Sequence, residues 1–283
     1  MRYNFYCGIL LLVLLISTNS SATQFKRIVT LGGAITETVN ALGFGPQIVA
    51  VDVTSEYPDF VKKLPKVSRN RSVSAEGIMA FRPEIVIAPY GDVPPALIQQ
   101  LRASGIRFVA IKQEYSVKGA LTFIREVGTA LGVADKGQAL AKQTELRISA
   151  ALLKVRTNKK KPKVLFIYAR GTGTMTVAGK GSNMEAIINL AGGHNAIQEF
   201  NRYKSYSTEA LVSANPDVIL LFDFGLKSLG GVNGIMDMPG VEFTKAGSHK
   251  QIIAMDGELL INFSVRLDKA ILELNKRLME YGG

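Results

Sequence analysis

The chain has 283 residues, with 34 lysines and arginines against 23 aspartates and glutamates, a formal net charge of +11 and one cysteine. This length exceeds one ordinary domain and suits two lobes. A basic surface favours anionic partners, but the sequence contains no nucleic-acid-binding motif, so we expect no nucleic-acid partner. A single cysteine excludes a disulfide within the chain.

The first 22 residues have the layout of a secretory signal. Arg2 gives a positive start, residues 8–16 form a short apolar run, and Ser20, Ser21 and Ala22 are small residues of the kind that a signal peptidase recognises. Spanning a bilayer takes about 20 apolar residues, so this run is too short for an anchor. We therefore predict a signal peptide at 1–22 and an exported mature protein that begins near Thr23.

Each half of the chain opens with an apolar strand and then a helix. The strand at 27–31 leads through two glycines into a helix expected at 36–42, and the strand at 163–168 leads into a helix expected at 184–191. Alternating strands and helices predict open, mostly parallel sheets flanked by helices, which is the α/β class. Ligands of such sheets bind outside the carboxyl ends of the strands.

Two later segments, 74–87 and 207–220, repeat one pattern. Each reads Ser-x-Glu, a short helix, a proline, an acidic residue and a buried strand. Ser74 and Ser207 are good N-caps, and the proline after each helix stops it. One such unit is weak evidence, but two in the same chain indicate two lobes of related construction.

A long helix is predicted between the lobes, over residues 134–157. Leu146, Ala150 and Leu153 recur at helical spacing, and the segment contains no proline. The charged stretch at 158–162 ends it. We therefore predict two lobes joined by one stiff helix, with small opening motions. The predicted units are the signal peptide (1–22), the N-terminal lobe (23–133), the linker helix (134–161) and the C-terminal lobe (162–283).

The chemistry of an enzyme is missing from the sequence. The glycines at 171–181 do not have the spacing of a phosphate-binding loop, and no nucleophile motif occurs. The two histidines, His194 and His249, are too few for a usual transition-metal site without several carboxylates. We predict no catalytic residue, no metal site and no cofactor.

A family resemblance becomes specific at residues 49–77. The segments Val-Ala-Val-Asp-Val-Thr-Ser, Tyr-Pro, Leu-Pro-Lys-Val and Arg-x-x-Ser-Ala-Glu-Gly follow one another there, and Val-Ala-Gly, Leu-Ala-Gly-Gly and Tyr-Lys-x-x-Ser occur within 177–207. The chain resembles the haem-uptake branch of the periplasmic binding proteins. That branch is part of the vitamin B12 and siderophore-binding class, whose lobes are joined by one long helix.

The resemblance implies a role in iron uptake. The protein would be a monomeric periplasmic substrate-binding protein of an ABC transporter, with haem or a similar bulky anionic iron chelate as transported ligand and an inner-membrane ABC permease as partner. Two alternatives stay open. One is a siderophore or corrinoid carrier of the same class, and the other is a secreted enzyme that uses the same cleft.

One position departs from the family pattern. Haem-binding relatives carry an iron-ligating tyrosine two residues before the arginine that is Arg71 here, whereas this chain has Arg69. Arginine does not ligate ferric iron, but it pairs with carboxylates such as a propionate. Arg170 lies in the stretch where some relatives have a histidine ligand. Either another group ligates the iron, or the ligand is a different bulky anion.

The expected ligand-binding residues follow from these patterns. Tyr203 and Tyr206 precede the second Ser-x-Glu helix as Arg69 precedes the first, and Tyr90 follows the strand at 85–88. Aromatic residues on loops near a cleft are commonly recognition residues. We predict a cleft lined by Arg69, Arg71, Tyr90, Arg170, Tyr203 and Tyr206.

Glu76 and Glu209 occupy equivalent places in the two repeats. Locally, a glutamate in the first turn is favoured by the helix dipole by about 0.3–1 kcal/mol. The resemblance implies a second role, because one such glutamate on each lobe meets arginines of the permease in this class. We expect both to be permease-docking residues.

Overall fold

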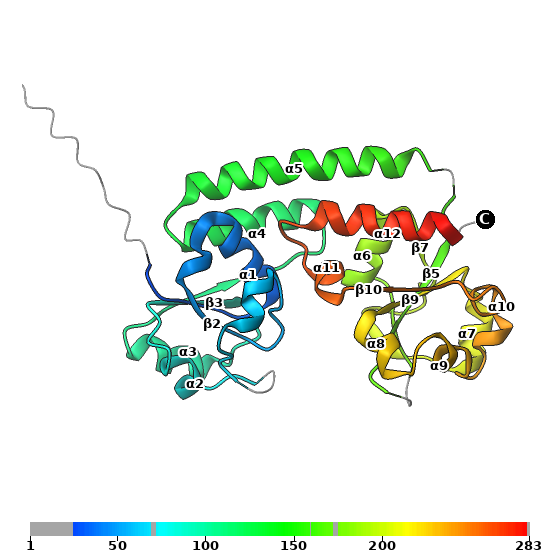
Figure 1. The fold of residues 1–283 in the computed structure, drawn as a ribbon, viewed down its shortest axis with the longest axis horizontal. Helices are drawn as coiled ribbons and strands as arrows, with labels where there is room; N and C mark the ends of the chain where they lie inside the picture. Colours follow the sequence, from blue (N-terminus) through cyan, green and yellow to red (C-terminus); the bar gives the residue numbers. More distant parts are fainter. Residues whose placement is uncertain (1–24, 69–71, 159, 172–174, 282–283) are drawn as a thin grey trace, which may run out of the picture.

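Two sheets organise the chain, one in each lobe (Figure 1). The computed structural model describes residues 25–68, 72–158, 160–171 and 175–281. The predicted signal peptide at 1–22 and the predicted ligand contacts Arg69 and Arg71 lie outside these residues. No helix in the described part of the chain is long and apolar enough to cross a membrane.

The first sheet has four parallel strands in the order β2-β1-β3-β4. Because the strands are parallel, their carboxyl ends meet at one edge. The strands are β1 (Ile28–Thr30), β2 (Ile48–Val51), β3 (Ile85–Pro89) and β4 (Arg107–Ile111). The helices around them are α1 (Gly33–Val39), α2 (Ala75–Met79), α3 (Pro95–Ala103) and α4 (Val117–Ala130), with a π-helical turn at Asn40–Phe44 and 3₁₀ turns at Gly45–Gln47 and Asp59–Lys63.

Both faces of the first sheet are buried. Ile28 and Ile85 pack with Phe123 of α4 on one face, whereas Val86 packs with Leu101 of α3 on the other. Strands covered on both sides are apolar throughout, which is why the sequence shows apolar runs here and no alternation. The repeat pattern is confirmed, because the Ser74 hydroxyl accepts a hydrogen bond from the Gly77 amide at 3.0 Å and caps α2.

The second sheet is mixed. Its order is β10-β9-β5-β6-β8, with β7 beside β5. The pairs β10–β9, β9–β5 and β5–β7 are parallel, whereas β5–β6 and β6–β8 are antiparallel. The strands are β5 (Lys163–Tyr168), β6 (Thr176–Ala178), β7 (His194–Asn195), β8 (Tyr203–Ser205), β9 (Val218–Phe222) and β10 (Ile252–Met255).

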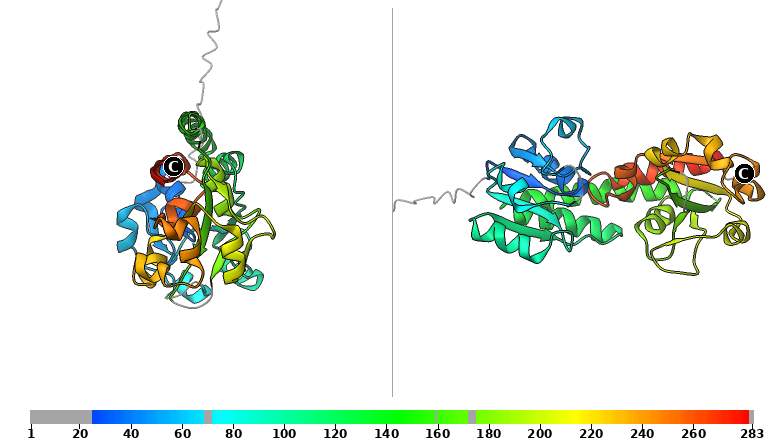
Figure 2. Two further views of the ribbon diagram at one scale, coloured as in Figure 1. Left: turned by 90° about the vertical axis from the view of Figure 1, so that its right-hand side faces the viewer. Right: turned by 90° about the horizontal axis from the view of Figure 1, so that it is seen from below.

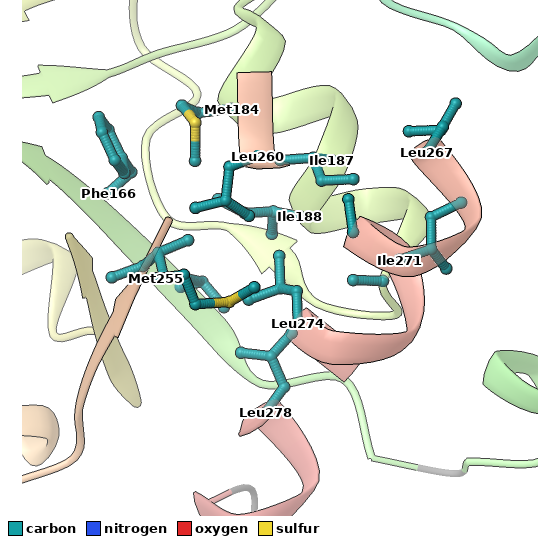
Figure 3. Close-up of a cluster of buried hydrophobic side chains, with 14 of the residues drawn as sticks. Phe166, Met184, Ile187, Ile188, Met255, Leu260, Leu267, Ile271, Leu274 and Leu278 are labelled. Atoms are coloured by element: carbon teal, nitrogen blue, oxygen red, sulfur yellow. The ribbon is translucent and has the colours of Figure 1, made fainter. Parts of the chain in front are cut away.

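The helices of the second lobe cover both faces of this sheet. Phe166 of β5 packs against Met184 and Ile188 on one face, together with Leu274 and Leu278 of the last helix (Figure 3). The opposite face packs against α7, α9 and a 3₁₀ turn at Val241–Phe243. The helices are α6 (Asn183–Leu190), α7 (Thr208–Ala214), α8 (Asp223–Ser228), α9 (Val232–Met236), α10 (Lys245–Ser248), α11 (Gly257–Ile261) and α12 (Leu267–Tyr281).

One long helix, α5 (Ala134–Arg156), joins the lobes and runs past both of them (Figures 1 and 2). The predicted helix is confirmed, and the apolar residues that indicated it do not all face the core. Leu146 and Leu153 are 65% and 64% exposed, whereas Ile148 and Ala151 are buried.

Small residues decide which face of α5 is buried. At Gly128 of α4, an added Cβ would lie 2.7 Å from the Cα atom of Gly137 in α5. The two helices therefore approach through backbone contact at this point, which a larger side chain would prevent. Ala141 continues the same buried row along α5.

Candidate ligand-binding cleft

The carboxyl ends of both sheets border a cleft between the lobes. A first cavity of about 370 Å³ is lined from the first lobe by strand ends and from the second lobe by Asn183, Ile261 and Asn262. A second cavity of about 530 Å³ adjoins it, because Thr54 and Ile261 line both. The site thus lies where ligands of open α/β sheets are expected.

The Asp-Val-Thr-Ser segment after β2 shapes the floor of the first cavity. The Asp52 carboxylate accepts hydrogen bonds from the Gly32 amide at 2.9 Å, from the Ser55 hydroxyl at 2.6 Å and from the Thr54 hydroxyl. Gly32 follows β1 with a φ of 92°, which few residues other than glycine adopt. The family motif at 52–55 therefore holds two strand ends together.

Apolar and polar groups share the lining of the first cavity. Leu31, Ile35, Val93 and Phe123 supply apolar surface. Gln113 also lines it, and its Nε2 is buried without a hydrogen-bond partner in the described structure. A buried amide donor without a partner is costly, so Gln113 is suited to donate to a polar atom of a ligand.

An aromatic cluster forms the second-lobe side of the cleft. The rings of Phe222 and Phe224 lie 5.4 Å apart, and the Tyr168 ring contacts both edge-on at 6.2 and 6.1 Å. Phe222 and Phe224 line the second cavity, and Phe224 is 41% exposed. We call Tyr168, Phe222 and Phe224 the aromatic wall. Of these three residues, Phe222 and Phe224 add aromatic apolar surface to the second cavity.

Arg170 is held in place at the edge of the aromatic wall. Its Nε donates a hydrogen bond to the Tyr168 hydroxyl at 2.7 Å, and its guanidinium carbon lies 5.1 Å from the centre of the Phe224 ring. Arg170 lines the second cavity. These two contacts hold the guanidinium in place through Nε and the ring. Its terminal NH groups can then donate hydrogen bonds to a carboxylate or phosphate.

Tyr203 lines neither cavity, but it contacts Asn183, which lines the first one. Its hydroxyl donates a hydrogen bond to Oδ1 of Asn183 at 2.5 Å, and its ring meets Phe166 edge-on at 6.4 Å. Burial raises the pKa of the Tyr203 phenol well above its ordinary value, and the neighbouring Tyr115 raises it further. The phenol therefore stays protonated and acts as a hydrogen-bond donor.

Tyr115 lines the first cavity but was missed from the sequence. It follows β4, and its ring meets Phe263 edge-on at 5.4 Å. Burial, and next the nearby Asp92, raise the pKa of its phenol. The available signal was its place just after a strand, the same reasoning that selected Tyr90.

Tyr90 and Tyr206, like Tyr203, are absent from the linings of both cavities. Tyr90 is 73% exposed, although its neighbour Pro89 belongs to the lining of the first cavity. Tyr206 packs against Phe200 at 6.1 Å and against the core of the second lobe. Contact of either residue with a ligand stays a prediction.

Glu76 and Glu209 are both exposed, in the first turns of α2 and α7. These helices cover the sheet faces opposite the long helices α4, α5 and α12, because Ile78 of α2 and Leu211 of α7 belong to the cores on those faces. The pKa of the Glu209 carboxyl is lowered by a hydrogen bond from the backbone amide of Glu209 and, to a smaller extent, by one from the Ser207 side chain. A role of Glu76 and Glu209 in docking on the permease stays a prediction.

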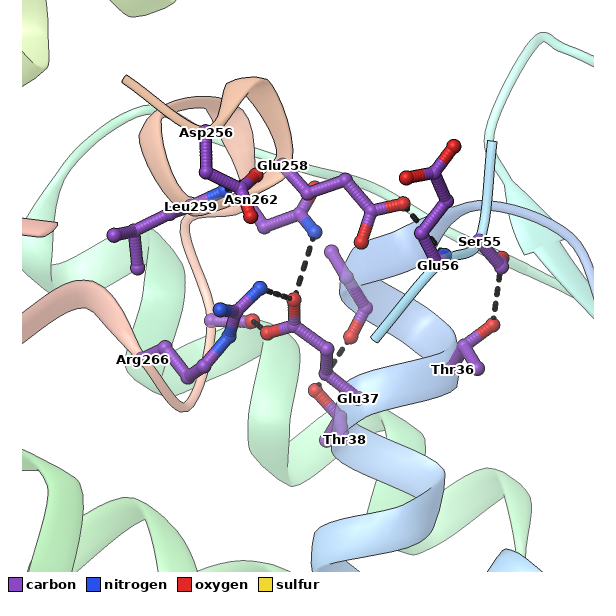
Figure 4. Close-up of polar contacts among 12 residues, drawn as sticks. Thr36, Glu37, Thr38, Ser55, Glu56, Asp256, Glu258, Leu259, Asn262 and Arg266 are labelled. Carbon is purple, nitrogen blue, oxygen red and sulfur yellow. Dashed lines mark hydrogen bonds and ion pairs between the residues drawn. The ribbon is translucent and has the colours of Figure 1, made fainter. Parts of the chain in front are cut away.

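A buried carboxylate joins the two lobes beside the cleft. Glu37 of α1 is 1% exposed. It accepts hydrogen bonds from Nδ2 of Asn262 at 3.0 Å and from the Ser264 hydroxyl at 3.3 Å, and it forms an ion pair with Arg266 (Figure 4). The Arg266 guanidinium also stacks 3.8 Å from the centre of the Tyr57 ring. The sequence analysis had assigned no role to this group.

Glu258 forms a second contact between the lobes. Its Oε1 accepts a hydrogen bond from the Glu56 amide at 2.8 Å, while its Oε2 is buried without a partner in the described structure. Burial is the main reason why the pKa of Glu258 rises to about 8, and Glu37, Asp256 and Glu56 raise it further. Burial of this carboxyl group therefore favours its protonated form at neutral pH.

The comparisons with known proteins agree with this architecture. The model of the family named Periplasmic binding protein matches residues 28–259. The chain therefore belongs to that family.

Two solved structures are similar over nearly the whole chain. The periplasmic heme-binding protein RhuT from Roseiflexus sp. RS-1, in its apo form, is 37% identical with a TM-score of 0.87, and 91% of this chain and 99% of that chain are covered. The periplasmic heme-binding protein BhuT in complex with two hemes is 35% identical, with a TM-score of 0.86 and the same coverage. The resemblance indicated by the sequence motifs is confirmed.

Two curated relatives also bear the names of substrate-binding proteins, and one of these names gives vitamin B12 as the ligand. A vitamin B12-binding protein of Vibrio vulnificus is 25% identical over 251 residues, which cover 88% of each chain. An uncharacterized ABC transporter substrate-binding lipoprotein of Bacillus subtilis, YvrC, is 27% identical over 252 residues, covering 88% of this chain and 78% of the relative.

The raised pKa of Glu258 predicts a pH-dependent stability. An unfolded glutamate has a pKa of about 4.3, so between that pH and about 8 the folded protein holds one more proton than the unfolded chain at this site. The contribution of Glu258 to the free energy of unfolding therefore falls as pH rises through this window and levels off above it.

Urea unfolding between pH 5 and 9 measures this contribution. The free energy of unfolding of the Glu258→Gln variant should fall less than that of wild type as pH rises. Plots of this free energy against pH should therefore diverge between the two proteins. A control is Glu273→Gln, which removes a carboxylate from an exposed ion pair with Arg277. Parallel curves for wild type and Glu258→Gln would show that Glu258 titrates normally.

Proposed function

We propose that this protein is the substrate-binding component of an ABC importer and that it captures haem between its lobes. The observation that carries the proposal is the aromatic wall beside the oriented Arg170, in a chain 35–37% identical to two haem-binding structures. Haem combines a flat apolar ring with propionate groups. The wall suits the ring, and the guanidinium suits a propionate.

The proposed binding mode follows from the contacts in the cleft. The ring lies against Phe222 and Phe224, and a propionate pairs with Arg170. Since Arg170 is already held by the Tyr168 hydroxyl and the Phe224 ring, binding immobilises little further side-chain freedom. Tyr203 contributes as a neutral phenol. Arg69 and Arg71 lie outside the described residues, and their contact with the ligand stays a prediction.

We also propose a carrier and not an enzyme. The curated and structural relatives bear the names of binding proteins, and a binding protein needs only a cleft and a docking surface. Export through a cleaved signal at residues 1–22 and a periplasmic, monomeric protein complete the proposal. It is supported by the family match and by the secretory layout of the N-terminal sequence.

Docking on the permease is proposed for Glu76 and Glu209. Both are exposed, one on each lobe, at the start of helices that are capped in the same way by a serine. Two equivalent carboxylates on a chain of net charge +11 give a basic protein two distinct acidic points. Such points suit positive patches on a transporter that carries one for each lobe.

A corrinoid is the second candidate ligand. It is favoured by the vitamin B12-binding relatives, one of which aligns over 88% of this chain. A corrin ring carries amide groups where a porphyrin carries carboxylates, so it would gain less from Arg170. Titration with cyanocobalamin beside haemin separates the two candidates.

Haemin titration of the mature protein tests the haem proposal. We expect saturable binding followed by the Soret band, and about tenfold weaker binding for Arg170→Gln, because hydrogen bonds to a charged group contribute about 1.5–3 kcal/mol. Arg277→Gln, which alters an exposed arginine on α12, is the matched control. Saturable cyanocobalamin binding without a haemin response would overturn the proposal in favour of the corrinoid.

Charge reversal tests the docking proposal. Glu76→Lys and Glu209→Lys should each abolish ligand-stimulated ATPase activity of the reconstituted transporter, since like charges at an interface cost several kcal/mol. Haemin affinity and melting temperature should stay at wild-type values, because both side chains are exposed. Glu145→Lys on the exposed side of α5 is the control. Intact stimulation by a variant would overturn the docking assignment for that glutamate, and lost haemin binding would instead assign it to the cleft.

A further inference from the structure

The second sheet has a hollowed edge on the side opposite the cleft. The strands β5, β7, β9 and β10 run parallel, so their amino ends meet there, whereas their carboxyl ends border the cleft. Two cavities open at this edge, of about 420 and 660 Å³, and Lys161 and Asp217 line both. The edge lies beside α10 and the end of α12, on the side of the second lobe that faces away from the first lobe (Figure 1).

Lysines gather in the linings of these two cavities. The charged stretch after α5 supplies two of them, and all four are exposed: Lys160, Lys161, Lys163 and Lys245. We call these four lysines the basic edge. In the described linings they stand against the single carboxylate of Asp217, and each cavity also holds one histidine, His249 or His194. The site is therefore strongly positive and suits an anion.

The loop after α7 fixes two lysines of the basic edge. The Lys163 ammonium donates a hydrogen bond to the Ala214 carbonyl oxygen at 3.0 Å, and its backbone amide donates to Asp217 at 2.8 Å. The Lys245 ammonium pairs with Asp217 at 3.4 Å, and its backbone amide donates to Oδ1 of Asn215 at 2.8 Å. An ammonium has three donors, so both lysines keep donors for a ligand. Because both side chains are already held, binding restricts little further side-chain freedom.

Several separate ammonium groups suit phosphate. Lysine binds phosphate as a compact point charge. A phosphate monoester carries about −1.5 to −2 charges at neutral pH and three strong acceptor oxygens, so it can accept from several ammonium groups at once. The two cavities share Lys161 and Asp217 as a common wall. This arrangement suits a ligand with more than one phosphate group, with Lys161 between the groups.

We propose that the basic edge is a binding site for phosphate-bearing anions, separate from the ligand cleft, and that Lys161 contacts the phosphate groups. Small soluble polyphosphates and the head groups of anionic phospholipids both carry this chemistry. The site goes beyond the proposed capture of haem, because it lies at the opposite edge of the sheet and uses none of the residues of the cleft.

Two probes test the site on the full mature protein. Inorganic pyrophosphate is titrated by calorimetry, and vesicles of phosphatidylglycerol in phosphatidylcholine are tested by co-sedimentation, with pure phosphatidylcholine vesicles as the blank. Both measurements use 0.15 M salt, where a Debye length of about 8 Å screens attraction to scattered surface charges. We expect saturable binding of at least one probe. Pyrophosphate binding would support the site with a soluble ligand, and binding to the anionic vesicles alone would support it with a lipid surface. If neither probe binds, the proposal is wrong.

Charge reversal at Lys161 separates a site from a generally basic surface. Lys161→Glu should weaken binding of the responding probe by about tenfold or more, because hydrogen bonds to charged groups are among the stronger ones. Lys142→Glu makes the same charge change at an exposed position of α5 and should leave the affinity within about twofold of wild type, since a distant exposed charge is screened. Equal weakening in both variants would overturn the proposal.

Two further readouts keep this test independent of the haem proposal. The melting temperature of Lys161→Glu should equal that of wild type, because the side chain is exposed. Its haemin affinity should also be unchanged, because the basic edge and the cleft lie at opposite edges of the sheet. A loss of haemin binding in Lys161→Glu would contradict the separation of the two sites. If wild type itself does not bind haemin, the haem proposal fails while the phosphate measurements keep their meaning.

Discussion

The buried carboxylate of Glu37 is the constraint on which the arrangement of the two lobes depends. Its partners Asn262, Ser264 and Arg266 all belong to the segment that links α11 to α12. On the other side of that segment, Arg147 of α5 donates a hydrogen bond to the Val265 carbonyl oxygen at 3.0 Å. The segment is thus held between the first lobe and the long helix. A buried charge without these donors would be strongly unfavourable.

The cleft inherits its shape from this attachment. Asn262 contacts Glu37 and lines the first cavity, and Ile261 lines both cavities. Glu258, one turn earlier, reaches the Glu56 amide across the same boundary. The lobes are therefore joined covalently by α5 and non-covalently by the segment around α11. Small opening motions, which a single stiff helix predicts, stay a prediction. A cleft with two attachments would suit a rigid, flat ligand.

Much of the fold could be predicted because its signals are local. Serine caps, helix-stopping prolines and apolar runs identified α2, α7 and the strands after them, and α5 followed from its length. The antiparallel strands β6 and β8 were missed, since both are only three residues long. The ion pair of Glu37 with Arg266 spans 229 positions, and no local pattern signals a contact over that separation. Arg170, which was selected through the family resemblance, lines the second cavity. Tyr115 lines the first cavity and was not selected, although it follows a strand as Tyr90 does.

Urea unfolding of Glu37→Ala tests most directly whether this carboxylate holds the lobes together. Removing one partner of a buried ion pair leaves the other without compensation, so the free energy of unfolding should fall by about 3–5 kcal/mol. Glu273→Ala, which breaks an exposed pair with Arg277, should change it by less than about 1 kcal/mol. If Glu37→Ala unfolded at the same urea concentration as wild type, the lobes would be held together by other contacts and the account would be wrong.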